Sequence, residues 1–494
     1  MPQSASRIRG LFAVAETLES RRLLSGQSIT FPADSGVIDV TDPFLGVVPD
    51  DGLDDTAAIQ RVFDLVSPGR VLYFPDGQYD LSGQTLLQKS AFTAEAESLD
   101  YTGWSLQTEG ERTFLEAVDV GTGPDDAGRI TFNFDAIEAS RVLTLTHRFT
   151  DGNDNSFYYR INGGDWRANS RPVGNTDWRS GVVATGIPLE TGSNTLEIAV
   201  REAGFQIDNI GVAYLGNYLN NIQIQGQSEA GTVFKLADGA TNDDGTPFDG
   251  ALIKWENGVE QFFRTAVRDV TFDVGDNNPE ADALKFHGNN QSVVANVTMI
   301  AGEGSGDVGL DLAHTAAIGP IMVRDLTVEG FNIGVHSGWQ NASRTMENIT
   351  VRNQREYGVV NEAAAQLFVR NLRSENSVPA FRNNSVRLPG DGQGKVILLD
   401  SVFLGLPGAE STYAINTLGD MYVRNVRTSG YDIALANFNQ QSFRGYRGQD
   451  GIDGDYIGEW WTRGQNGGDR GGFSNAFESP DTMLRLPIRE EPVV

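Results

Sequence analysis

Residues 267–270 read Val-Arg-Asp-Val, and six later segments repeat this order of an apolar residue, a variable residue, Asn or Asp, and renewed apolar alternation. The seven segments are Val267–Val270, Val294–Val297, Val323–Leu326, Met346–Ile349, Val369–Leu372, Leu398–Asp400 and Val423–Val426. Successive Asn or Asp positions lie 27, 29, 23, 23, 29 and 25 residues apart, which is too short for a βαβ unit and too long for a hairpin. Loose repeats of this length predict a solenoid.

The residue types predict which kind of solenoid this is. The segments carry β-branched residues at a period of two, and no 3.6-residue apolar stripe lies between them, so the repeats are strands. Asn adopts a left-handed backbone more readily than any residue except Gly, so an Asn between two strands can turn the chain while its apolar neighbours stay inside. We therefore expect an all-β chain built as a single-stranded parallel β-helix, with its Asn/Asp turns stacked from coil to coil.

Composition limits the class of protein to which this chain can belong. The 494 residues exceed one ordinary domain, and 57 Gly with moderate charge suit turn-rich β structure. The absence of Cys excludes disulfides and thiolate metal sites. A net charge of −28 disfavours nucleic acid and anionic membrane as partners, and no apolar run approaches a membrane span. These features predict a soluble acidic protein.

The first 26 residues differ from the rest of the chain. They hold four arginines but only a short apolar stretch, residues 11–15, which is weak for a secretory signal core. Residues 18–25, Leu-Glu-Ser-Arg-Arg-Leu-Leu-Ser, resemble a short N-terminal tag of exported and surface proteins of some bacteria. The resemblance implies an extracellular or cell-surface location, and the alternative is a disordered leader.

Residues 27–88 are expected to form the N-terminal cap and first coils. The acidic run 50–55 precedes an amphipathic segment in which Ile59, Val62 and Phe63 share one face, as in a helix that closes the open end of a solenoid. Asp54 or Asp55 can accept from the free backbone donors of that helix, so we interpret these acids as structural rather than metal-binding.

The same region carries a family resemblance. Residues 37–60 and the strand Val71–Tyr79 resemble the opening of the pectate lyase superfamily, in particular the branch with glycoside hydrolase family 55 and the rhamnogalacturonase/epimerase-like proteins. The resemblance implies a right-handed parallel β-helix that acts on polysaccharide. The chain departs from these families because the polygalacturonase motifs are missing and only one β-helix is present, whereas family 55 enzymes have two.

Residues 89–215 interrupt the repeat. Segments 129–134 and 142–146 alternate as strands of an antiparallel sandwich do. Segments 94–98, 156–164 and 204–210 resemble the carbohydrate-binding modules of families 6 and 35. That resemblance implies a structural Ca²⁺ held by Glu95, Glu97 and Asp208, a set of oxygen ligands that suits a hard cation. The alternative is three solvated surface acids.

Sugar rings bind by stacking on aromatic faces, so the tryptophans of this inserted module are candidate ligand residues. Trp104, Trp166 and Trp178 are the candidates, although most Trp residues of a sandwich belong to its core. Trp178 is the first choice because it lies in the polar run Asn-Thr-Asp-Trp-Arg. The coil pattern resumes after the module, so residues 216–450 are expected to be β-helix coils and residues 451–494 a Gly-rich C-terminal tail.

In the pectin-active β-helices that the chain resembles, the cleft runs along the strand one bend before the Asn/Asp turn, and this resemblance implies that the chemistry lies on that face of the solenoid. The corresponding stretches are 283–287, 309–313, 334–338, 358–362 and 380–384. If the second residue of each points inward, the third and fifth point outward. The outward residues are then Lys285, Asp311, His336, Val360 and Arg382 in one column, and His287, Ala313, Gly338, Glu362 and Asn384 in the other.

Asp311 and Glu362 lie two coils apart, so their backbones are separated by roughly 10 Å. Two carboxyls at that separation leave room for a water, which suits an inverting glycoside hydrolase with one acid and one base. We therefore predict Asp311, Glu362 and His336 as catalytic residues, and Lys285, His287, Arg382 and Trp178 as substrate-binding residues. A hydrolase of this kind needs no cofactor for catalysis, and its partner is a polysaccharide.

Two alternatives use the same face. A polysaccharide lyase would neutralise a uronate with a cation and remove its C5 proton with a base, roles open to Lys285, His287, His336 and Arg382. A non-catalytic surface protein would only bind the polymer. Four arginines also recur on one line of the repeat, as an anion-binding stripe or, more commonly, as a salt-bridged surface. They are Arg268, Arg324, Arg370 and Arg424.

Overall fold

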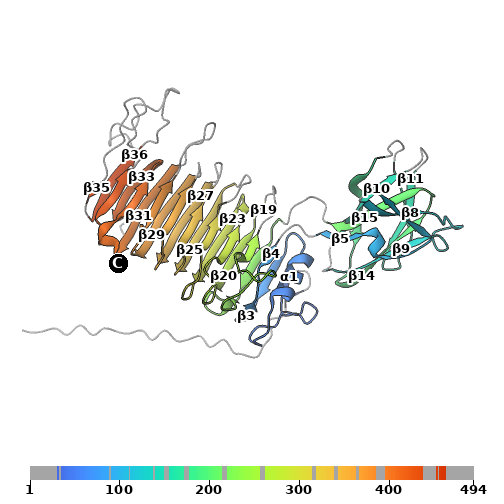
Figure 1. The fold of residues 1–494 in the computed structure, drawn as a ribbon, viewed down its shortest axis with the longest axis horizontal. Helices are drawn as coiled ribbons and strands as arrows, with labels where there is room; N and C mark the ends of the chain where they lie inside the picture. The colour runs from blue at the N-terminus through green and yellow to red at the C-terminus, as the bar shows by residue number, and fades with distance from the viewer. Residues whose placement is uncertain are drawn as a thin grey trace, which may run out of the picture.

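A computed structural model describes residues 31–32, 35–87, 91–110, 112–136, 140–149, 155–171, 177–213, 220–255, 262–313, 319–338, 343–362, 366–384, 395–437, 452–453 and 455–462. The proposed export tag therefore lies outside the described residues. Figure 1 shows an elongated solenoid of stacked strands with a second unit beside its N-terminal end. The described part of the chain contains no helix with the length and hydropathy of a membrane span.

Two long sheets run along the solenoid, and their strands pair in parallel until the last coil. Sheet A contains, in order, β1 (Val37–Asp39), β2 (Val71–Phe74), β16 (Gln223–Gly226), β20 (Ala266–Asp273), β23 (Ser292–Ile300), β25 (Ile321–Glu329), β27 (Ser343–Arg352), β29 (Gln366–Asn376), β31 (Lys395–Gly405), β33 (Asp420–Arg427) and β36 (Tyr456–Thr462), with β3 (Gly77–Leu81) and β17 (Thr232–Leu236) beside this path. Sheet B contains β4 (Thr85–Leu87), β18 (Ala251–Trp255), β21 (Asp282–Phe286), β24 (Val308–Leu312), β26 (Ile333–Ser337), β28 (Tyr357–Glu362), β30 (Phe381–Asn384), β32 (Tyr413–Thr417), β34 (Ile433–Asn437) and β35 (Ile452–Asp453). The predicted parallel β-helix is confirmed.

The Asn and Asp residues of the repeat lie at the bends of sheet A. All seven have φ between 49° and 58°, the left-handed conformation that the pattern predicts. Their side chains also bond from coil to coil, because the Asn348 amide donates to Asp325 at 2.9 Å and the Asn371 amide donates to Asn348 at 2.8 Å. An Asp cannot donate, so each Asp ends a run of amide bonds.

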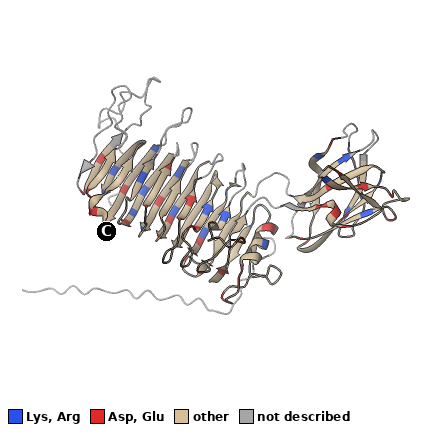
Figure 2. Cartoon of the chain, in the orientation of Figure 1, with Lys and Arg blue, Asp and Glu red and all other residues tan. Residues whose placement is uncertain are grey.

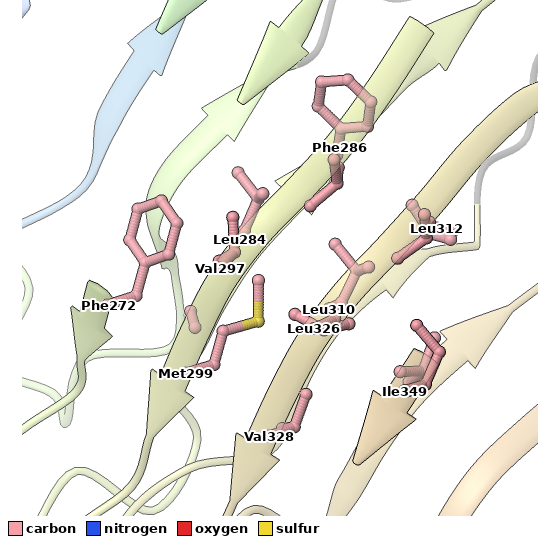
Figure 3. Close-up of a cluster of buried hydrophobic side chains, with 14 of the residues drawn as sticks. Phe272, Leu284, Phe286, Val297, Met299, Leu310, Leu312, Leu326, Val328 and Ile349 are labelled. Atoms are coloured by element: carbon pink, nitrogen blue, oxygen red, sulfur yellow. The ribbon is translucent and has the colours of Figure 1, made fainter. Parts of the chain in front are cut away.

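The interior between the sheets is a continuous apolar core that runs along the solenoid. Figure 3 shows Leu284 and Leu310 of sheet B pointing towards Val297 and Leu326 of sheet A. Each strand therefore contributes its alternate residues to the core, and the residues between them face outward. This alternation puts the candidate site on the outer face of sheet B.

The N-terminal cap is helix α1 (Thr56–Leu65), whose Ile59, Val62 and Phe63 join the core of the solenoid. The acids before it bond to backbone groups. Asp54 accepts from the amides of Thr56 and Ser82, and Asp55 accepts from the amide of Val48 at 3.1 Å. These bonds support the structural interpretation of the acidic run.

Between β4 and β16 the chain forms a unit of two antiparallel sheets. One sheet contains β5 (Ala91–Glu95), β7 (Trp104–Glu109), β8 (Arg112–Ala117), β10 (Ser140–Phe149), β13 (Arg179–Pro188) and β15 (Phe205–Ala213), and the other contains β6 (Asp100–Thr102), β9 (Arg129–Ala136), β11 (Asn155–Ile161), β12 (Arg167–Arg171) and β14 (Gly192–Val200). Their facing side chains form a core separate from that of the solenoid. The unit also contacts the cap, because Arg61 pairs with Asp135 at 2.9 Å and the buried Arg141 donates to the Leu65 carbonyl.

The C-terminal end differs from the expected tail. Residues 451–494 are expected to be a Gly-rich tail, yet β36 pairs antiparallel with β33 and β35 pairs antiparallel with β34. Trp460 of β36 is buried in the solenoid core. Part of the segment therefore covers the open end of the last coil, where the core would otherwise meet solvent.

Candidate active site

A row of polar side chains crosses the outer face of sheet B. Parallel pairing puts Lys254 opposite Lys285, Lys285 opposite Asp311 and Asp311 opposite His336. The row continues through Val360 to Arg382. Its register is the one expected from the sequence, with neighbouring strands about 4.8 Å apart. Residues from six coils thus lie on one line.

His336 lies between two carboxylates. Its Nε2 atom is 3.1 Å from a Glu362 oxygen, and its Nδ1 atom is 3.7 Å from an Asp311 oxygen. Asp311 also lies 3.4 Å from the Lys285 ammonium and accepts the Ala313 amide at 2.8 Å. The Asp311 side chain is only 9% exposed, whereas the Glu362 side chain is 44% exposed. The imidazole therefore connects a nearly buried acid to an accessible one.

This contact changes what the two acids can do. In an inverting hydrolase the space between the carboxyls holds a water and the scissile bond. Here the imidazole of His336 fills the space between Asp311 and Glu362, so the three groups form one unit. An imidazole hydrogen-bonded to an accessible carboxylate can exchange protons with it and with a substrate placed above both.

The local charges favour the protonated form of His336. Burial lowers the pKa of His336, but the hydrogen bond to Glu362 and the negative charges of Asp311 and Asp282 outweigh it, so its pKa lies above the ordinary value. Burial and the nearby Asp311 also raise the pKa of Asp282 to about 7, against the hydrogen bond from the Val308 amide. Burial and the charge of Lys285 lower the pKa of Lys254. The charged groups in and beside this row therefore form a cluster in which neighbours influence one another's protonation.

Three members of this cluster escaped the sequence analysis: Lys254, Asp282 and Arg344. Lys254 belongs to the coil before the first stretch that the alignment used, residues 283–287, and Asp282 immediately precedes that stretch. Arg344 is fully buried inside the solenoid, although it lies in a strand of the repeat. A signal was present for Arg344, because it occupies a position where the neighbouring coils carry Ile321 and Leu367.

Two other predicted substrate-binding residues of the solenoid differ from each other. Arg382 lies on the outer face with its guanidinium 4.9 Å from the centre of the Tyr357 ring. His287 was expected to point outward with Glu362, but its side chain is only 3% exposed. Strand β21 ends at Phe286, so the two-residue alternation no longer applies at His287. His287 is therefore not on the accessible face.

The predicted calcium ligands lie in the inserted unit. Asp208 forms an ion pair with Arg112 at 2.5 Å, and Glu95 accepts from the Asn209 amide at 3.5 Å. Burial raises the pKa of Asp208, and Arg112 opposes that effect. Across the ranges that the structure describes, no group of three His, Asp or Glu side chains could hold a metal. Asp208 is thus already paired with Arg112, and the calcium site at Glu95, Glu97 and Asp208 stays a prediction.

Each of the three candidate tryptophans of the inserted unit contacts other side chains of the protein. Trp104 is buried in its core. The Trp166 indole donates to Asp125 and lies under the guanidinium of Arg160 at 4.3 Å. Trp178 has the guanidiniums of Arg112 and Arg148 at 4.7 and 4.8 Å from its ring centre, a cation–π arrangement, and its role in sugar binding stays a prediction.

The arginine line of sheet A is in register along the solenoid. The pairing places Arg268, Arg324, Arg370 and Arg424 in one row, with other residues between them. Arg370 pairs with Asp400 at 3.2 Å, and Arg324 lies 3.9 Å from Asp325. Figure 2 shows basic and acidic residues interspersed along these strands. This arrangement agrees with a salt-bridged surface.

Comparison with known proteins gives a partial match. A family model described as "Rhamnogalacturonase A/epimerase, pectate lyase-like" matches residues 215–382, about a third of the chain. The matched range contains Lys285, Asp311, His336 and Glu362 and ends at Arg382. No curated protein matches the chain. The family match, together with the parallel β-helix, supports a polysaccharide-active protein.

Several solved structures are similar to a part of the chain. The chain is similar to a GH26-CBM35 β-(1,4)-mannanase of Podospora anserina, with 21% identity over 26% of this chain and 28% of that chain and a TM-score of 0.22. It is similar to an exo-β-1,3-galactanase of Phanerochaete chrysosporium, with 19% identity over 25% and 29% and a TM-score of 0.22. A family 35 carbohydrate binding module of Clostridium thermocellum matches with 16% identity over 26% of this chain and 99% of the module, again with a TM-score of 0.22.

Proposed function

We propose that the chain is an extracellular polysaccharide lyase that cleaves a uronate polymer by β-elimination on the outer face of sheet B. The observation that carries the proposal is the 3.1 Å contact between His336 and the accessible Glu362. The two groups form one acid–base pair on one side of the bound polymer. Hydrolysis with inversion needs its acid and base on opposite sides of the sugar, whereas elimination can use both from the same side.

The charges of the two groups fit separate steps. The raised pKa of His336 favours an imidazolium that can donate a proton, and Glu362 as a carboxylate can accept one. Glu362 takes the proton from C5 of the uronate, the C4=C5 double bond forms and the bond from C4 to the glycosidic oxygen breaks. His336 protonates the departing oxygen. Proton transfer from Glu362 to His336 across their hydrogen bond then restores both groups, so the proton balance closes.

The cations of the row suit an acidic substrate. Lys285 and Arg382 lie in the same line as His336, although the whole chain carries a charge of −28. Elimination builds negative charge next to the uronate carboxylate, and a fixed cation stabilises that charge most strongly where water is excluded. Arg382 lies one strand beyond Glu362 and can pair with a substrate carboxylate in a bidentate way.

An inverting glycoside hydrolase that uses Asp311 and Glu362 is the second candidate. It is favoured by the presence of two acids on opposite sides of His336. This mechanism requires the imidazole to move away when substrate binds, so that a water can enter between the acids. A protein that only binds the polymer is the third possibility, and the same experiment separates all three.

The test is incubation of the full chain with pectins, alginate, sulfated polymers and neutral β-glucans, with reducing ends and the ultraviolet absorbance of unsaturated products recorded together. The proposal expects both signals to rise on a uronate polymer. Reducing ends without absorbance would replace the lyase with the hydrolase. Retained binding without either signal would support the binder and exclude catalysis at His336.

A further inference from the structure

The interior of the solenoid directly under the candidate site contains a charged side chain. Arg344 belongs to β27 of sheet A, is 0% exposed and points into the space between the sheets. Burying an unpaired guanidinium is costly, so an arginine at a core position requires compensating contacts. No ion pair between Arg344 and a carboxylate occurs within 4 Å among the residues that the structure describes.

The contacts of Arg344 lead to the strands of the site. One terminal nitrogen donates to the Ser337 hydroxyl at 2.9 Å, and the other donates to the Leu312 carbonyl. Leu312 follows Asp311 in β24, and Ser337 follows His336 in β26. One guanidinium thus joins the two strands at the residues next to the two that face each other on the outside.

A chain of buried hydrogen bonds continues from this point along sheet B. The Ser337 hydroxyl donates to the Asn361 side-chain oxygen at 3.2 Å, and the Asn361 amide donates to Asn383 at 3.2 Å. The Asn383 amide donates to the Thr417 hydroxyl at 3.2 Å, which donates to the Gly419 carbonyl at 3.1 Å. All donors point away from Arg344, so the bonds polarise one another in one direction.

Three inward links of this chain are neighbours in sequence of outward site residues. Ser337 follows His336, Asn361 precedes Glu362, and Asn383 follows Arg382. We infer that Arg344 is a positioning residue, which fixes the strands that carry Asp311 and His336 to each other and supplies a positive charge to the site from inside. The importance of Arg344 for catalysis rests on the proposed function. Its effect on the protonation of His336 can be measured without any catalytic activity.

The charge of Arg344 acts within a defined set of groups. Those around His336 are Lys254, Asp282, Lys285, Asp311, Glu362 and Arg382. Burial lowers the pKa of Arg344 to about 9, while the negative charge of Asp311 supports its charged form. A cation near an imidazole disfavours the imidazolium, so removing the charge of Arg344 makes His336 easier to protonate.

The test is a nuclear magnetic resonance titration of the full chain with isotope-labelled histidine. The chain has only four histidines, so the His336 signal can be assigned with the variant His336→Asn. In Arg344→Gln the titration midpoint of His336 rises by about one pH unit. In Arg344→Lys, which keeps the charge, it stays nearer the wild-type value. The matched control Arg141→Gln removes another buried arginine, far along the chain, and leaves His336 unchanged.

A second variant covers the case in which Arg344→Gln does not fold. Arg344→Leu places in the core the kind of residue that the neighbouring coils carry as Ile321 and Leu367, and it removes the charge, so His336 shifts in the same direction. A folded Arg344→Leu or Arg344→Gln protein whose His336 titrates as in the wild type would overturn the inference. The titration needs no turnover, so inactivity on every polymer would remove the lyase proposal and leave this result standing.

Discussion

The two faces of the solenoid carry polar rows of opposite character. On sheet A the bends hold Asn or Asp in every one of seven coils, and their side chains bond to one another. On sheet B the outward row changes residue at each coil, from Lys285 to Asp311 to His336. Repetition of one residue type marks a structural ladder. A row that keeps the register but changes its chemistry marks a surface built for a ligand.

The largest expected effect is a loss of catalytic activity when the polar row of sheet B is changed. His336→Gln removes the proton donor of the sheet B row, so kcat on the cleaved polymer falls by about 10²–10⁴-fold while the fold is retained. In the wild type, activity declines as pH rises through the raised pKa of His336, because the imidazolium is lost. A rate profile recorded from acid to alkaline pH checks this. A His336→Gln protein with wild-type kcat would show that the row is only a surface.

A second expected effect concerns stability on the sheet B side. Asp282 titrates near 7 in the folded chain and near 3.8 when unfolded, so the folded state binds the proton more tightly. Its contribution is fully present below pH 3.8 and is lost as pH rises through 7, up to about 4 kcal/mol. Asp282→Asn therefore flattens the decline of the free energy of unfolding between pH 4 and 7, measured by denaturant titration.

A matched control keeps that test specific. Asp432→Asn changes an exposed acid elsewhere in the solenoid and leaves the pH dependence as in the wild type. His336 acts in the same direction, since its pKa is also raised, and accounts for any remaining decline above its unfolded value. An unchanged slope in Asp282→Asn would contradict the assigned titration.

Substitutions in the Asn/Asp ladder of sheet A should change the stability of the protein but not its catalytic rate. Asn348→Ala puts a less tolerant residue at φ 58° and removes the bonds to Asp325 and from Asn371, so the free energy of unfolding falls by about 2–3 kcal/mol with kcat unchanged. Asp325→Asn adds a donor opposite Asn296 and should stabilise by about 0.5–1 kcal/mol. A destabilised Asp325→Asn protein would show that the ladder does not depend on donors.

The smallest effect is expected in the inserted unit. Because Asp208 is paired with Arg112, adding calcium or a chelator should leave the thermal unfolding midpoint unchanged. Differential scanning calorimetry measures this directly. A calcium-dependent rise of the midpoint would support Glu95, Glu97 and Asp208 as ligands, since a ligand that binds only the folded state stabilises it.

The sequence predicted the two rows unequally, for physical reasons. The Asn/Asp bends are specified locally, because the left-handed backbone allows few residue types, and so they could be recognised without any structure. The outward row followed from strand alternation, which puts Leu310 and Leu312 in the core with Asp311 between them but does not extend past the end of β21 at Phe286. That is why Asp311, His336 and Glu362 were placed correctly on the face and His287 was not.

Contacts between side chains from different coils could not be predicted in this way. The placement of the His336 ring between Asp311 and Glu362 depends on rotamers, not on register. The hydrogen bonds of the buried Arg344 and its neighbours join residues from 7 to 34 positions apart, on different coils or different sheets. The sequence did contain one indication of the buried polar chain. Ser337, Asn361 and Asn383 are polar at positions where Phe286 and Leu312 are apolar.

The most direct test of a catalytic site on sheet B compares one glutamate from each face. Glu362→Gln and Glu347→Gln are equal chemical changes, the first beside His336 and the second on the outer side of sheet A. Each variant is incubated with the uronate polymer, and the initial rate of unsaturated product formation is measured. We expect Glu362→Gln to lose about 10²-fold or more of the rate and Glu347→Gln to keep it. Equal rates in the two variants would contradict the assignment of the site to sheet B.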